Sequence, residues 1–139
     1  MWRLPVIVMM VACGAVPQAG ADTVSIDQPF VLQVGRQVRW ADADLTLHFE
    51  RVLADSRCPR GERCVVAGVA RIRIRVEGAG QPGLDLDLQL PDQPSAALPT
   101  QAATLTLLRL DPYPVSGRAS ASEDARATLV IRKAEATDR

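Results

Sequence analysis

Two cysteines, Cys58 and Cys64, lie close together in a short polar stretch of the sequence. Their separation is too long for a C-x-x-C redox motif. Proline sets the backbone for the first central position of a β-turn and glycine relieves its exit, so the run Pro59-Arg60-Gly61 can reverse the chain between them. A reversal of this kind can bring two Cα atoms to the spacing that a disulfide needs. We therefore predict a structural disulfide that closes an exposed turn.

Three arginines, Arg57, Arg60 and Arg63, accompany the two cysteines. An exposed rigid loop loses little entropy on docking, so these arginines form a candidate binding loop for an unknown protein or another anionic partner in the cell envelope. Two other interpretations stay open. In one, the disulfide only keeps a long hairpin from fraying and the arginines are solvated. In the other, which rests on loop shape alone, the loop imitates a protease substrate and inhibits.

A different class of function would act through the cysteines themselves, in a thiol-disulfide or metal-responsive envelope protein. A sensing pair would titrate within the glutathione range of potentials, whereas a structural disulfide would resist it. Zinc bound by Cys58, Cys64 and the single histidine, His48, would still need a fourth ligand at a spacing that matches no common pattern. His48 also alternates with apolar neighbours and should lie on the polar face of a strand. We expect no metal and no cofactor.

The sequence is poor in groups that could converge for catalysis. No serine lies within a Gly-x-Ser-x-Gly elbow, and one exposed histidine leaves no general base. Asp85 and Asp87 have expected arginine partners, and the remaining aspartates in turns act as turn acceptors. We therefore predict that the protein is not an enzyme. Aromatic residues make up only 4% of the chain, which argues against a single-stranded nucleic-acid binder.

Residues 1–21 carry one positive charge, an apolar run and an Ala-x-Ala site, the pattern of a secretory signal peptide. An alternative is a lipoprotein anchored through Cys13. We expect a periplasmic or secreted protein in which residues 22–139 form a single domain, a monomer by default. The sequence contains no run of about 20 consecutive apolar residues, so we expect no transmembrane segment. The 16 basic and 16 acidic residues of the whole chain give no electrostatic case for nucleic acid.

The periodicity of the chain from Val24 onward is that of β-strands, with no convincing helical stripe. We expect an antiparallel, immunoglobulin-like β-sandwich of about seven to eight strands, with a small β-barrel as the alternative. The expected strands cover residues near 24–26, 30–34, 37–40, 45–53, 65–76, 84–90, 103–110 and 126–133. The proline-containing segment 91–100 is expected to be a loop that crosses between sheets.

The clearest pattern alternates arginines with apolar residues in 71–76 and leucines with acids in 84–90. A hairpin that places Arg73 opposite Asp87 and Arg75 opposite Asp85 puts the apolar side chains on one face. In the expected strand 103–110, Leu105 and Leu107 lie on one face, whereas Leu108 and Leu110 fall on the opposite parity. This change predicts a bulge or a strand buried on both faces.

The motifs Asp55-Ser56-Arg57-Cys58-Pro59, Cys64-x-x-Ala67-Gly68-x-Ala70 and Leu110-Asp111-Pro112-Tyr113-Pro114 resemble those of a family of small exported bacterial β-domain proteins. Many members of that family are lipid-anchored, and their function is uncharacterised. The resemblance covers most of the chain after residue 28. It departs from the family pattern at Val66, where a tryptophan is expected. It implies export and a β fold and carries over no catalytic or binding residue.

Overall fold

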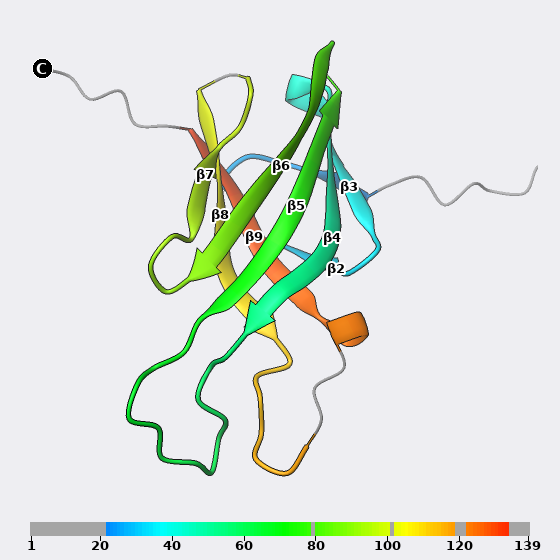
Figure 1. The fold of residues 1–139 in the computed structure, drawn as a ribbon. Helices are drawn as coiled ribbons and strands as arrows, with labels where there is room; N and C mark the ends of the chain where they lie inside the picture. Colours follow the sequence, from blue (N-terminus) through cyan, green and yellow to red (C-terminus); the bar gives the residue numbers. More distant parts are fainter. Residues whose placement is uncertain (1–21, 79, 101, 119–121, 134–139) are drawn as a thin grey trace, which may run out of the picture.

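The protein is an all-β sandwich of two sheets, which confirms the predicted fold class (Figure 1). The computed structural model describes residues 22–78, 80–100, 102–118 and 122–133. The first sheet has the order β1 (Asp22–Val24), β3 (Gln37–Trp40), β4 (Leu45–Asp55), β5 (Ala70–Gly78) and β6 (Gln81–Leu90). The second has the order β2 (Phe30–Gln33), β9 (Arg126–Lys133), β8 (Ala103–Asp111) and β7 (Ser95–Ala97).

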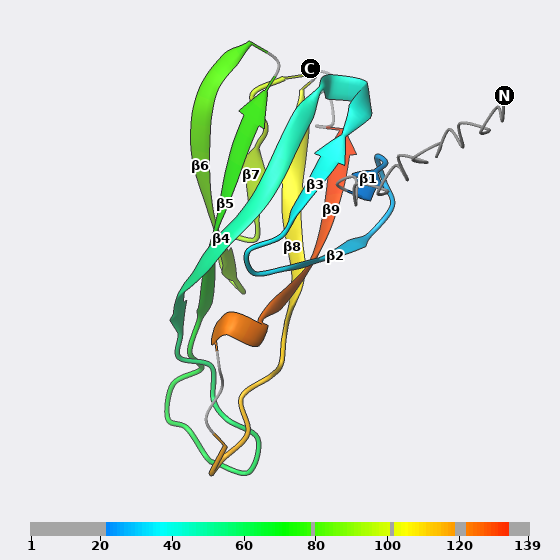
Figure 2. The ribbon, with the colours of Figure 1, turned by 90° about the vertical axis from the view of Figure 1, so that its right-hand side faces the viewer.

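All neighbouring strands are antiparallel except β1 and β3, which run parallel. Two short 3-10 helices, η1 (Ala41–Ala43) and η2 (Ser122–Asp124), precede β4 and β9. Seen edge-on, the two sheets form separate layers, and the long loops gather at one end (Figure 2). The nine described strands slightly exceed the expected seven to eight.

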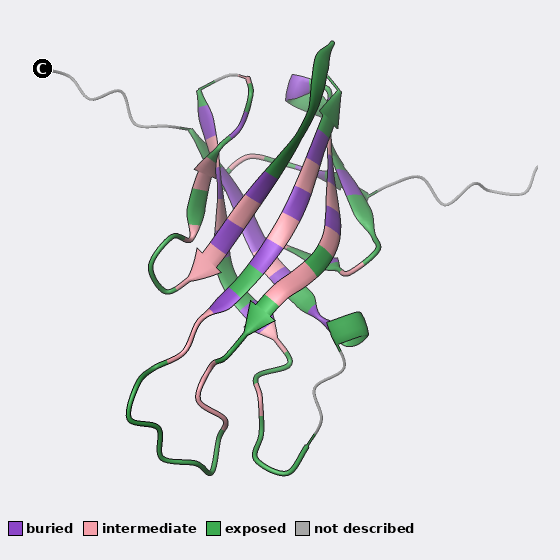
Figure 3. Cartoon of the chain, in the orientation of Figure 1, coloured by how far each residue is buried: buried purple, intermediate pink, exposed green. Residues whose placement is uncertain are grey.

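The core lies between the two sheets and is built from the apolar residues that alternate along each strand. In β5 the buried Ile72, Ile74 and Val76 alternate with arginines on the outer face. From the opposite layer, Leu105 and Leu107 of β8 are equally buried. Figure 3 shows this alternation as buried and half-buried bands along the strands, whereas the loop end is mostly exposed. The loops at that end are therefore positioned by a rigid, packed scaffold.

The β5–β6 hairpin has the register that the charge pattern predicted. Arg73 faces Asp87 and Arg75 faces Asp85. The Arg73 Nε donates to Asp87 at 2.8 Å, and the Arg75 Nη1 donates to Asp85 at 3.0 Å. Asp87 also accepts a hydrogen bond from Arg71 at 3.1 Å. Because a one-residue slip would place leucines opposite arginines, these pairs specify the register of the hairpin.

Replacement of Asp87 by asparagine should destabilise the protein at neutral pH but not in acid. The hydrogen bond from Arg73 lowers the pKa of Asp87 below its ordinary value of 3.8. A lowered folded-state pKa contributes stability that is present above the unfolded pKa and is lost as the pH falls through the folded one. At pH 7 we expect Asp87→Asn to cost about 1 kcal/mol, or about 5 °C in melting temperature.

Thermal melts of the wild type and Asp87→Asn from neutral pH down to about pH 3 measure this effect. The difference between the two proteins should shrink below about pH 4, where Asp87 of the unfolded chain takes up a proton before Asp87 of the folded protein does. Asp92→Asn is the matched control, because Asp92 is exposed and forms no ion pair with the residues that the structure describes. A pH-independent difference would show that the carboxylate charge is not the cause.

Several expected strand bounds differ from the structure. The first strand is Asp22–Val24 rather than 24–26, and β6 begins at Gln81 rather than at residue 84. Residues 65–69 were expected to belong to a strand, but β5 begins at Ala70, because the ladder between β4 and β5 ends with the pair of Asp55 and Ala70. Val65 and Val66 are consequently 103% and 77% exposed. Segment 91–100 does cross between the sheets, but it also contains β7, which forms by pairing with β8 rather than from a pattern of its own.

The parity change in β8 is a bulge, as one of the two interpretations predicted. Leu107 pairs with Leu129, and Arg109 already pairs with Thr128, so Leu108 is the extra residue. Leu110 returns to the core at 2% exposure, whereas Leu108 is 42% exposed. The bulge therefore presents a leucine on the protein surface.

The predicted signal peptide of residues 1–21 and the alternative lipid attachment at Cys13 lie outside the described residues. Within the described ranges, no helix has the length and apolar character needed to cross a lipid bilayer.

Candidate binding site at the stapled loop

The stapled loop, residues 56–69, connects β4 to β5 and contains the predicted disulfide. Cys58 and Cys64 are bonded, with their Cα atoms 5.9 Å apart. Cys58 is half-buried and Cys64 is exposed. The loop extends beyond the end of the sandwich, beside the loop that follows β8 (Figures 1 and 2).

The stapled loop docks against the facing segment, residues 112–118, through backbone hydrogen bonds. The Arg60 N–H donates to the Pro114 carbonyl at 3.0 Å, and the Ser116 N–H donates to the Arg60 carbonyl at 3.0 Å. Arg60 and Val115 form a parallel β-bridge. The Tyr113 hydroxyl adds a hydrogen bond of 3.0 Å to the Cys58 carbonyl. The two loops thus hold each other in place beyond the end of the sheets.

The base of the stapled loop is closed by a very close backbone approach. The Ser56 N–H donates to the Val69 carbonyl at 2.8 Å, and the Val69 N–H donates to the Ser56 hydroxyl at 3.0 Å. A Cβ atom added at Gly68 would overlap the carbonyl group of Ser56. Only glycine fits there without a backbone shift, which explains a glycine at this position in the loop motif.

Arg57 was expected to be an exposed residue of the candidate binding loop, but its side chain does not project into solvent. Its side chain is 10% exposed and forms a two-point ion pair with Asp55, at 2.8 Å from Nε and 2.7 Å from Nη2. It also donates from Nη1 to the Leu110 carbonyl at 2.8 Å and from Nη2 to the Pro112 carbonyl at 3.2 Å. Its guanidinium carbon lies 4.8 Å from the centre of the Tyr113 ring. Arg57 therefore links the stapled loop to the end of β8 and is a structural residue.

Arg60 and Arg63 are the two exposed arginines of the stapled loop. The Arg60 guanidinium carbon lies 5.2 Å from the centre of the Tyr113 ring, a cation-π distance. Among the described residues, neither arginine has a carboxylate within ion-pair distance. Glu62, between them, accepts a hydrogen bond from the Ser116 hydroxyl at 3.0 Å. The loop thus presents two positive charges whose ionic contacts are available to a partner.

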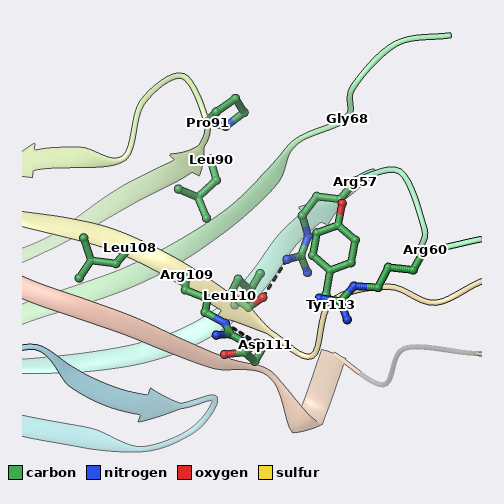
Figure 4. Close-up of a pocket in the computed structure, with 10 residues that line it drawn as sticks. All are labelled: Arg57, Arg60, Gly68, Leu90, Pro91, Leu108, Arg109, Leu110, Asp111 and Tyr113. Carbon is green, nitrogen blue, oxygen red and sulfur yellow. Dashed lines mark hydrogen bonds and ion pairs between the residues drawn. The ribbon is translucent and has the colours of Figure 1, made fainter. Parts of the chain in front are cut away.

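A groove of about 380 Å³ lies between the stapled loop and the ends of β6 and β8 (Figure 4). Its size falls at the lower end of the range of small-molecule pockets, about 300–1,000 Å³. One end of the groove is apolar and is lined by Leu90, Pro91 and Leu108. The β8 bulge is what brings Leu108 to this surface.

The other end of the groove is cationic. Tyr113 lies there with Arg57 and Arg60, and Arg109 lies between the two ends (Figure 4). The Arg109 Nε donates to Asp111 at 2.8 Å, so this pair is internally compensated. Tyr113 and the parity change at Leu108 are visible in the sequence, but neither was predicted to belong to a site. The tyrosine between two prolines and the break in leucine spacing were the available signals.

Outside the stapled loop, the described histidine, cysteine and carboxylate side chains form no cluster that could hold a metal ion. His48 lies on β4 on the polar face, as its alternation predicted, but it is half-buried rather than exposed. Its ladder partners are Gln37 and Arg75. In the part of the chain that the structure describes, no three His, Cys, Asp or Glu side chains are placed to hold a metal ion. The features that the structure does bring together are the disulfide, the two exposed arginines and the groove.

Comparison of the chain with protein-family models, with curated proteins and with solved structures finds no match.

Proposed function

We propose that this protein is a non-catalytic exported domain that binds an anionic partner in the cell envelope through its stapled loop. The observation that carries the proposal is the pair of exposed arginines, Arg60 and Arg63, on a loop that a disulfide closes and that hydrogen bonds hold against the facing segment. A guanidinium without an internal carboxylate keeps its full capacity for charge-assisted hydrogen bonds to a carboxylate or phosphate.

Preorganisation supports the same proposal. The disulfide closes the loop, the facing segment holds Arg60 through two backbone hydrogen bonds, and Tyr113 contacts both the loop backbone and the Arg60 guanidinium. A loop that is ordered before binding loses less conformational entropy when a partner docks. A disulfide also fits an oxidising compartment and hence export, which the resemblance to exported β-domain proteins implies as well.

The double variant Arg60→Gln/Arg63→Gln should lose partner binding while its melting temperature stays unchanged. The oxidised full chain is immobilised, incubated with envelope extract, and the captured components are quantified by mass. Each lost charge-assisted hydrogen bond weakens binding by about tenfold or more. Added salt should weaken wild-type capture, because it screens exposed charges.

Arg36→Gln/Arg132→Gln is the matched control. It removes the same charge from exposed positions that lie outside the two loops. The control should capture as much as the wild type. Equal capture by the loop variant and the control, or no component retained above an empty matrix, would refute the proposed function.

A further inference from the structure

The charges around the groove leave a surplus of one positive charge at its Tyr113 end. Arg57 is neutralised by Asp55, and Arg109 by Asp111. Arg60 is the lining arginine without a carboxylate partner among the described residues. A site built in this way favours an anionic ligand over a neutral one, and one carboxylate is enough to balance the surplus charge.

The apolar end of the groove needs an apolar ligand part. The bulge in β8 turns Leu108 outward, where it remains 42% exposed, and the half-buried Leu90 and the exposed Pro91 lie near it at the end of β6. β-bulges often re-aim side chains next to functional sites. Figure 4 shows these three side chains at the end of the groove away from Tyr113 and Arg60, so the two chemistries are separated along the groove.

We infer that the groove binds a small carboxylic acid with an apolar tail, with the carboxylate on Arg60 beside Tyr113 and the tail over Leu90, Pro91 and Leu108. This inference rests on the proposed function and names the ligand class of the same site. The groove volume of about 380 Å³ corresponds to about a dozen water molecules at about 30 Å³ each, which is room for a ligand of about a dozen heavy atoms. A saturated ten-carbon acid, decanoate, has this size and this separation of charge and tail.

Titration calorimetry of the oxidised full chain with decanoate tests the inference. We expect saturable one-to-one binding. Arg60→Gln should weaken it by about tenfold, or about 1.4 kcal/mol, and Arg60→Lys should weaken it less. Leu108→Ser should also weaken it by about tenfold, because part of the tail loses its apolar contact. The side chains of Arg60 and Leu108 are both exposed, so the variants should keep the fold. A melting curve of each variant verifies this.

Two control proteins and two control ligands complete the experiment. Arg36→Gln and Val31→Ser change an exposed arginine and a 60% exposed valine away from the groove and should bind decanoate like the wild type. Decyltrimethylammonium, which has the same tail and the opposite charge, should not bind. Vesicles of anionic phospholipid distinguish a membrane lipid from the free acid, and they should not reproduce the dependence on Leu108.

Several results would overturn the inference. Decanoate binding that does not depend on Leu108, equal binding of the cationic analogue, or Leu108-dependent binding of vesicles alone would overturn the inference. So would the absence of saturation up to about 1 mM decanoate. If decanoate fails while capture from envelope extract still requires Arg60 and Arg63, this inference falls and the proposed function stands. If both experiments fail, the proposed function falls as well.

Discussion

Replacement of Arg57 by methionine should lower the melting temperature by about 8 to 15 °C, although Arg57 lies in a loop at the end of the molecule. The variant leaves the Asp55 carboxylate, 22% exposed, without its two-point partner. It also removes the donors to the Leu110 and Pro112 carbonyls. Removal of one member of a fully buried ion pair costs about 3–5 kcal/mol; these partly exposed groups should cost about 2–3 kcal/mol.

Arg63→Met is the matched control for this prediction. It removes the same kind of side chain from the same loop, and Arg63 makes no ion pair with the described residues. A change within about 0.5 kcal/mol is expected for the control. Arg57→Lys should recover only part of the loss, because an ammonium cannot reproduce the planar fork on Asp55. If Arg57→Met and Arg63→Met had the same melting temperature, Arg57 would not stabilise the protein by linking the loop to β8.

The second large effect should follow loss of the disulfide. Replacement of Cys58 and Cys64 by serine should lower the melting temperature by about 8 to 14 °C without abolishing the fold. A closed loop of about seven residues restricts the unfolded chain by about 2.4 kcal/mol, a substantial part of a total stability of about 5–15 kcal/mol. The fold should persist because the backbone bonds of Arg60 with Pro114 and Ser116 do not depend on the disulfide.

Melting curves of the double-serine variant, and of the wild type with and without reductant, measure this effect, and circular dichroism before the transition reports whether the β-sheet signal is retained. The reduced wild type should melt close to the double-serine variant. Identical melting of oxidised and reduced wild type would exclude a stabilising disulfide. Free thiols in protein purified without reductant would favour instead the thiol-disulfide or metal-responsive alternative.

The local parts of the fold could be predicted because their patterns repeat over neighbouring residues. The alternation in β5 and β6 predicted the buried face and the pairing of Arg73 with Asp87, since a slip of one residue would reverse every side chain. The bounds of β9, Arg126–Lys133, were predicted for the same reason. The disulfide followed from two cysteines with a turn between them. β7, with only three residues, has too little pattern of its own and forms only through its ladder with β8.

The sequence by itself thus determined most of the strands, the hairpin register and the disulfide, because a repeating pattern or a short separation along the chain marks each of them. Only the tertiary structure decided the different roles of the loop arginines. Arg57 donates a hydrogen bond to the carbonyl of Leu110, 53 residues away in the sequence. Arg60 contacts the Tyr113 ring and forms no ion pair with any described carboxylate. The groove likewise exists only where β6, β8 and the stapled loop meet. Contacts of such long sequence separation leave no periodic trace, so spacing alone could not separate the structural arginine from the exposed ones.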